Sequence, residues 1–105
     1  MTVIFHPEFP EDIRKFEAGY AQISSGLALR FRSEIDVAVA TVKSAPQSAG
    51  HFLNLGSSIV PEFRRRNLKA FPHFILYGIS DDLLIFGSVI PSRSDPLTWL
   101  ARFDS

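Results

Sequence analysis

FPEDIRKFEAGYAQISSGLALRFRSEIDVAVATV, residues 9–42, decides the fold, because two apolar stripes with helical spacing flank a short Ser-Ser-Gly break. Each stripe repeats every three or four residues, the spacing that keeps side chains on one face of a helix. The stripes are Phe9, Ile13, Phe16, Tyr20 and Ile23, and then Leu27, Phe31, Ile35, Ala38 and Val42. Gly26 ends the first helix, since glycine tolerates the left-handed conformation common at helix ends. Two helices joined this closely must run antiparallel, so the stretch predicts a helical hairpin.

The segments on either side of the hairpin predict strands. The candidates are residues 2–5, 59–68, 74–79 and 83–90. The second of these contains Pro61, which restricts that part of the strand to an edge or a bulge. Residues 46–57 are rich in polar residues and glycine and predict a loop, whereas Asp95-Pro96 is typical of the start of a short helical turn.

The order of these elements is β-α-α-β-β-β with a terminal helical turn. Short connections between the last three strands predict an antiparallel meander. We therefore expect an α+β domain in which the hairpin packs on one face of a mainly antiparallel four-stranded sheet. The residues expected mostly in the core between these layers are Phe16, Tyr20, Phe31, Ile35, Phe74, Leu76, Ile85 and Val89.

Length and composition indicate one domain, residues 1–105, in the cytoplasm. The chain has no cysteine, which excludes disulfides and thiolate metal sites. Its apolar runs are too short for a signal-peptide core or for the roughly 20 residues of a membrane span. His6, His51 and His73 do not have the spacing of metal ligands, and we expect neither a metal nor a cofactor.

The charges balance, with 11 basic and 11 acidic side chains and a net charge of zero. Because nucleic-acid-binding proteins usually carry a basic excess, any anion-binding surface must be local. The one dense basic cluster is Arg64-Arg65-Arg66 with Lys69. On a strand, Arg65 points away from Arg64 and Arg66. Two interpretations stay open: contact with an acidic partner, or solvated edge-strand charges that discourage aggregation.

Several short segments stand in an order typical of a known family. They are FHPE at residues 5–8, Gly26-Leu27 with Arg30-Phe31, the arginine run at residues 64–66, FPHFILY at residues 71–77, and VIPSR at residues 89–93 followed by Asp95-Pro96, Trp99 and Arg102. In order, spacing and agreement with the predicted elements, they resemble the RelE/ParE superfamily of type II toxin–antitoxin systems over nearly the whole chain. The details are most similar to the ParE, or plasmid-stabilisation, branch.

The resemblance implies a small toxin that a cognate antitoxin holds inactive by wrapping a C-terminal segment around it. Such a segment would add a helix or a strand to an apolar groove or a sheet edge. ParE-like members inhibit DNA gyrase, whereas RelE-like members cut messenger RNA on the ribosome. The residues expected to bind the target or a phosphate are Arg64, Arg65, Arg66, Lys69, Arg93 and Arg102.

Acid–base residues distinguish the two branches. Cleavage of RNA through the 2′-hydroxyl needs a base, an acid and cations. The family's ribonucleases often carry Tyr or His near the C-terminal end of the fold, but here the position after the last strand is Pro91 and neither residue follows Arg102. His73 replaces the Tyr of the family's Phe-Pro-Tyr pattern; we expect a structural histidine, with a proton carrier as the alternative.

We therefore expect a toxin that binds and inhibits DNA gyrase rather than a catalyst. A ribosome-dependent messenger-RNA endoribonuclease is the first alternative. A non-toxic member that acts only as an antitoxin-binding partner is the second.

Overall fold

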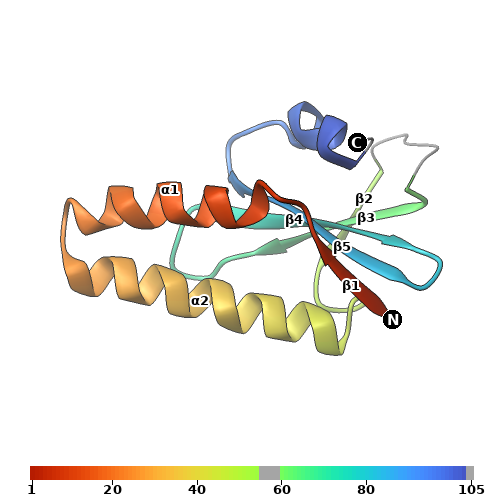
Figure 1. Ribbon diagram of the computed structural model, residues 1–105, viewed down its shortest axis with the longest axis horizontal. Helices are drawn as coiled ribbons and strands as arrows, with labels where there is room; N and C mark the ends of the chain where they lie inside the picture. Colours follow the sequence, from red (N-terminus) through yellow and green to blue (C-terminus); the bar gives the residue numbers. More distant parts are fainter. Residues whose placement is uncertain (55–59, 104–105) are drawn as a thin grey trace.

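The computed structural model describes residues 1–54 and 60–103 and shows the predicted helical hairpin (Figure 1). Helix α1 spans Phe9–Ala21 and helix α2 spans Ser25–Ser44. Pro10 occupies the first turn of α1, where a missing N–H costs nothing. The Ser24 hydroxyl caps α2 by accepting a hydrogen bond from the Leu27 N–H at 3.0 Å. The prediction that Ile23 belongs to the core stripe is wrong: α1 ends before it, and its side chain is 73 % exposed.

Five strands, rather than the predicted four, form the sheet. They are β1 (Thr2–Phe5), β2 (His51–Leu53), β3 (Glu62–Asn67), β4 (His73–Ser80) and β5 (Leu83–Pro91), in the order β1-β5-β4-β3-β2. β1 runs parallel to β5 and the other pairs are antiparallel, which confirms the mainly antiparallel prediction.

The additional strand, β2, lies inside the segment predicted as a loop, and it pairs with residues 63–65 of β3. A strand of three residues is too short to produce a recognisable alternation in the sequence. Because β2 covers it, β3 is not an edge strand, and Pro61 precedes it instead of interrupting it. Residue 59, where the predicted strand began, lies outside the described residues.

The main core lies between the helices and the sheet. Phe31 and Ile35 of α2 are buried against Tyr77, Phe86 and Val89 of the two central strands. Figure 1 shows that the tip of the hairpin projects beyond the sheet. At that end of the sheet, a cluster of rings packs between the layers. Its members are Phe16, Tyr20, Phe31, Phe71 and His73.

A second core covers the opposite face of the sheet. Phe74 and Leu76, predicted for the main core, belong to this one together with Phe63 and Ile90, because neighbouring strand residues point to opposite faces. Ile85 is only half-buried and belongs to neither cluster. The cover is η1, a 3₁₀ helix at Pro96–Phe103, as the terminal helical turn predicted. Its contribution comes from Trp99, Leu100 and Phe103. The two central strands are therefore covered on both faces.

Two glycines provide the seat for the last ring of η1. Tyr77 pairs with Phe86 and Leu76 with Ser88, so Gly87 is the extra residue of a β-bulge. A Cβ atom at Gly87 would lie 2.3 Å from Cζ of Phe103, and one at Gly78 would lie 3.2 Å from Cε1 of the same ring. The Phe103 ring therefore lies directly on the backbone of β4 and β5.

We predict that Gly87→Ala displaces Phe103 and lowers the free energy of unfolding by about 1–3 kcal/mol, the usual cost of overpacking. Urea denaturation measures this cost. In a Phe103→Ala background the same change should cost much less, because the ring it meets is gone. Gly19→Ala on α1 is the matched control: nothing lies within 4 Å of its added Cβ. It should stabilise the helix by about 0.5–1 kcal/mol. An equal cost of Gly87→Ala in both backgrounds would contradict the proposed seat.

Candidate functional site

Arg64 and Arg66 lie on the helix face of β3 and hold the connection between α2 and β2. An Nη1 N–H of Arg64 donates to the carbonyl of Gly50, and one of Arg66 donates to the carbonyl of Ala49, each at 2.8 Å. The Arg64 guanidinium also pairs with Glu62. These two arginines therefore have a structural role in the isolated chain, and their part in target binding stays a prediction.

Tyr77 of β4 also binds the connection between α2 and β2. Its hydroxyl donates to the carbonyl of Pro46 at 2.7 Å, and burial raises the pKa of Tyr77, which keeps that proton in place. A Cβ at Gly50 would lie 2.6 Å from the Tyr77 hydroxyl and 2.8 Å from the carbonyl oxygen of Arg65. Only glycine allows the backbone to approach this closely.

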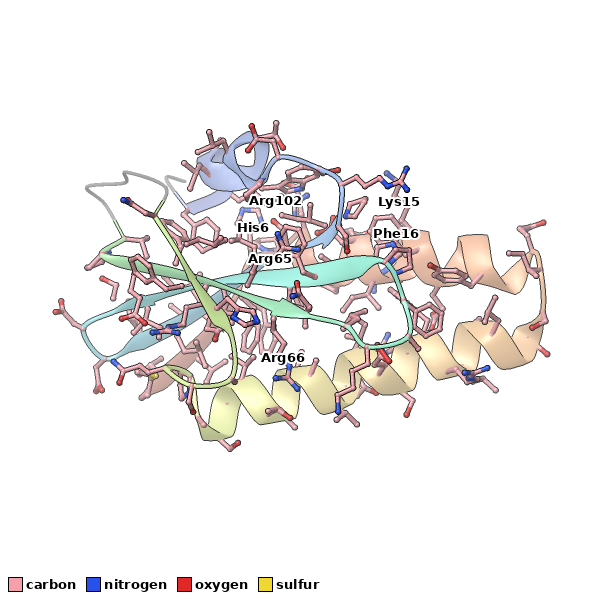
Figure 2. All side chains as sticks on the ribbon, turned by 180° about the vertical axis from the view of Figure 1, so that it is seen from behind. His6, Lys15, Phe16, Arg65, Arg66 and Arg102 are labelled. Carbon is pink, nitrogen blue, oxygen red and sulfur yellow. The ribbon has the colours of Figure 1, made fainter. Side chains whose placement is uncertain are left out.

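Arg65 lies on the opposite face of the sheet, as the alternation predicted. Its guanidinium carbon is 3.8 Å from the centre of the Phe74 ring, and its Nε–H donates to Asn67 at 2.9 Å. Figure 2 shows Arg65 over the sheet and Arg66 towards α2. The edge-strand interpretation is wrong for Arg64 and Arg65, because β2 pairs with that part of β3. Lys69 is exposed at the turn between β3 and β4, and Glu34 accepts its backbone N–H at 2.9 Å.

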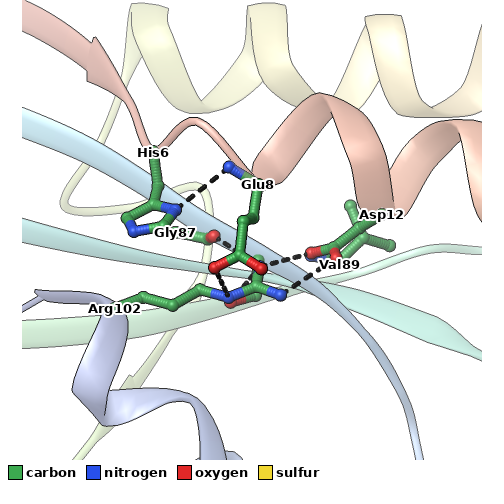
Figure 3. A network of polar contacts seen from close by, with 7 residues as sticks. His6, Glu8, Asp12, Gly87, Val89 and Arg102 are labelled. Atoms are coloured by element: carbon green, nitrogen blue, oxygen red, sulfur yellow. Dashed lines mark hydrogen bonds and ion pairs between the residues drawn. The ribbon is translucent and has the colours of Figure 1, made fainter.

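Arg102 of η1 connects this helix to α1 through an ion pair. It forms a two-point ion pair with Asp12, with Nη1–Oδ2 and Nη2–Oδ1 distances of 2.7 Å and 3.1 Å (Figure 3). Its Nη1 also donates to the carbonyl of Gly87 at 3.1 Å, and Asp12 accepts the Val89 N–H at 3.0 Å. β1 ends at Phe5, so this part of β5 has no neighbouring strand on that side, and Asp12 satisfies its exposed N–H.

Asp12 is the site residue that the sequence analysis missed. Its position in the first turn of α1 indicates only a favourable interaction with the helix dipole. No local pattern indicates a partner 90 residues away. For Arg102, binding of a target would require breaking a partly buried two-point pair, and that role also stays a prediction.

A hollow at the end of the central strands brings two of the predicted site residues together. It has a volume of about 320 Å³ and is lined by Pro72, His73, Pro91, Ser92 and Arg93. His73 and Pro91 face each other in the strand register, and the Ser92 N–H donates to the Pro72 carbonyl at 2.9 Å. Arg93 is exposed, and its guanidinium forms no hydrogen bond or ion pair with the described residues.

His73 is 6 % exposed and is held by aromatic rings. Its ring centre lies 4.4 Å from that of Phe16, 5.4 Å from that of Phe31 and 6.0 Å from that of Tyr20. Nδ1 is buried and has no hydrogen-bond partner among the described residues. Burial lowers the pKa of His73, so the ring is neutral at pH 7. The packing supports the expected structural histidine, yet the same ring lines the hollow.

A larger, apolar groove lies between the two helices beside β1. Its volume is about 410 Å³ and its floor is apolar, with Phe9, Ile13 and Ile35 among the lining side chains. Phe5 of β1 also lines the groove and is 43 % exposed, and its neighbour Ile4 is 42 % exposed. β1 stands at one end of the strand order, so its outer side pairs with no other strand of the described residues. The predicted exposed groove and sheet edge are thus both present.

Within residues 1–54 and 60–103, no group of three or more His, Cys, Asp and Glu side chains is arranged to hold a metal ion. In the same residues, no helix has the length and apolar character needed to span a membrane.

The stability of the protein should depend on pH through His73. Its folded pKa is below the unfolded value of about 6.5, so below that pH the unfolded chain takes up a proton that the folded chain does not. The contribution to stability is therefore fully present above about pH 6.5 and declines as the pH falls below it. The free energy of unfolding, measured with urea at pH 7.5 and at pH 5.5, should differ less between the two pH values in His73→Phe than in the unaltered chain. His51→Gln, which removes an exposed histidine, is the control; an unchanged difference in His73→Phe would contradict the assignment.

Comparison with known proteins bears on the fold. No protein-family model matches the sequence, and no curated protein sequence matches it. Among solved structures, a chain described as "Chromosomal ParDE TA system from P. aeruginosa" is similar, with a TM-score of 0.69 and 17 % sequence identity. The match covers 87 % of this chain and 95 % of that chain. Similarity at this identity shows the fold and leaves the function to be argued from the site. The chain has the RelE/ParE-like fold that its sequence predicted.

Proposed function

We propose that the protein is the toxin of a type II toxin–antitoxin pair, neutralised by a cognate antitoxin and acting by binding DNA gyrase. The observation that carries this proposal is the fold shared with a chain of a ParDE toxin–antitoxin system over nearly all of both chains. The sequence motifs that resemble the ParE branch also support the proposal, because they occur in this sequence in the order that is typical of the family.

The groove between α1 and α2, together with the free edge of β1, is the proposed antitoxin surface. Exposed Phe5 and half-buried Pro10 and Val39 give the groove an accessible apolar lining, which suits an amphipathic helix or an added strand. Lys43 at the rim lies 5.3 Å from the centre of the Phe5 ring and forms no ion pair with the described residues. We therefore expect the antitoxin segment to carry apolar residues with an acidic residue opposite Lys43.

Binding rather than catalysis is favoured by the way the charged groups are used. Arg64 and Arg66 donate to backbone carbonyls of their own chain, and Arg102 is paired with Asp12. Among the residues lining the hollow, His73 is the single candidate for proton transfer. RNA cleavage needs both an acid and a base, so this lining lacks one of the two.

A charge placed in the groove should weaken antitoxin binding. Ala40 is exposed and lines the groove, so Ala40→Glu adds bulk without removing a buried contact. The new carboxylate also lies one helical turn before Lys43, where it would compete with the acidic residue expected from the antitoxin. We expect its affinity for the antitoxin to fall at least about tenfold, or 1.4 kcal/mol. Ser33→Glu, at an exposed position of α2 that does not line the groove, is the control. Calorimetry with the cognate antitoxin measures both affinities, and equal affinities of the two variants would place the antitoxin elsewhere.

The target is tested with purified protein freed of its antitoxin. Incubated with gyrase and supercoiled DNA, it should inhibit the enzyme, whereas messenger RNA on translating ribosomes should stay uncut. Arg93→Ala should weaken gyrase inhibition in a graded way that fades at high salt, because an exposed charge mainly assists association. Arg30→Ala, at another exposed arginine with no ion pair among the described residues, is the control.

Two outcomes would contradict the proposal. Codon-phased cuts in the message that disappear in His73→Phe would identify the ribonuclease branch. No effect on either target would identify a protein that only binds its antitoxin.

A further inference from the structure

We propose that the hollow between the start of β4 and the end of β5 is a binding site for a carboxylate group. We assign that carboxylate to an acidic side chain of a protein ligand. The assignment to a protein rests on the proposed function, whereas the carboxylate site itself is argued from the hollow alone.

The hollow is preformed. His73 pairs with Pro91 across the two strands, and Ser92 donates its N–H to the Pro72 carbonyl at 2.9 Å. The two prolines have a fixed φ and no N–H, so they form stiff walls. A volume of about 320 Å³ admits a small ligand group without rearrangement of these walls.

His73 supplies a neutral donor. Its Nδ1 is enclosed without a partner among the described residues, and a proton there would be an unpaired buried donor. We therefore assign the single proton of the neutral ring to Nε2. The enclosed edge of the ring carries Nδ1, so only the opposite edge can meet a ligand in the hollow. Contacts with Phe16 and Phe31 hold the ring in this orientation.

Arg93 supplies the charge. Its guanidinium is exposed, lines the hollow and forms no hydrogen bond or ion pair with the described residues. A further cation is close, because Nζ of Lys15 lies 5.6 Å from the centre of the Phe16 ring that packs against His73 (Figure 2 labels both). The lining contains no acidic side chain. A ligand of negative charge is therefore favoured.

A carboxylate fits this set of donors better than the phosphates of a nucleic acid. One guanidinium fork binds one planar carboxylate with two hydrogen bonds, and a neutral imidazole N–H adds a third. Nucleic acids are bound through several cations along the backbone. Here Arg64 and Arg66 donate to carbonyls of their own chain, and Arg65 stacks on Phe74. The rest of the lining, two prolines and an aromatic edge, is poorly suited to a strongly hydrated phosphate.

The test uses NMR of the isolated full-length protein, with sodium acetate as the probe at constant ionic strength. The imidazole nitrogens of His73 and the backbone amides of Ser92 and Arg93 should shift in a saturable way. A dissociation constant on the order of 10 mM is expected for so small a ligand. Acetamide, which is neutral and has the same shape, should produce no saturation over the same range.

Two variants distinguish a specific site at Arg93 from nonspecific attraction of acetate to exposed positive charges. Arg93→Gln should weaken acetate binding at least about fivefold, because the two-point contact is lost. Arg30→Gln removes an exposed, unpaired charge from α2 and should leave binding unchanged. In His73→Phe, the amides of Ser92 and Arg93 serve as the readout, and binding should weaken as well.

The outcomes are distinct. Inorganic phosphate binding more tightly than acetate, with the same dependence on Arg93, would overturn the proposal in favour of a nucleic-acid ligand. Absence of saturation with acetate, or equal binding of acetamide, would overturn the site altogether. None of these measurements involves gyrase or an antitoxin. The carboxylate site can therefore be confirmed or refuted whether or not the proposed function is correct.

Discussion

The two central strands, β4 and β5, are covered on both faces, and the rest of the structure depends on that double burial. One face needs the helical hairpin, which supplies Phe31 and Ile35. The other needs η1, whose Phe103 ring occupies the space that a Cβ atom at Gly87 would fill and lies close to Gly78. Since removal of apolar surface from water is the main driving force of folding, each cover stabilises the same pair of strands.

The basic side chains are divided between structure and surface. Arg64 and Arg66 donate to backbone carbonyls of the connection after α2, and Arg102 donates to the carbonyl of Gly87 at the bulge. A guanidinium suits this task because it carries five donors in a fixed planar arrangement. Of the arginines predicted to bind a target, Arg93 is the one whose guanidinium has no partner among the described residues. A dense run of arginines in a sequence therefore need not form a basic patch on the surface.

His73 is both a core side chain and part of the lining of the hollow. Aromatic rings surround it as they would any core side chain, and burial keeps it uncharged. At the same time it lies at the end of β4, where the sheet stops and the hollow with Arg93 begins. A neutral imidazole held rigidly beside a free guanidinium is suited to recognising a group and less suited to transferring a proton between two partners.

The sequence by itself determined the helical hairpin, the long strands and the terminal turn, because each of these leaves a periodic or capping pattern among neighbouring residues. It also determined that Arg65 opposes Arg64 and Arg66, since alternation is a local property of a strand. Only the tertiary structure decided the rest. The three residues of β2 are a strand because β3 lies beside them, and Phe74 faces η1 because the chain end folds back over the sheet. The pair of Asp12 and Arg102 joins residues 90 positions apart, and such a contact depends on where the whole chain places its two ends, which no local pattern encodes.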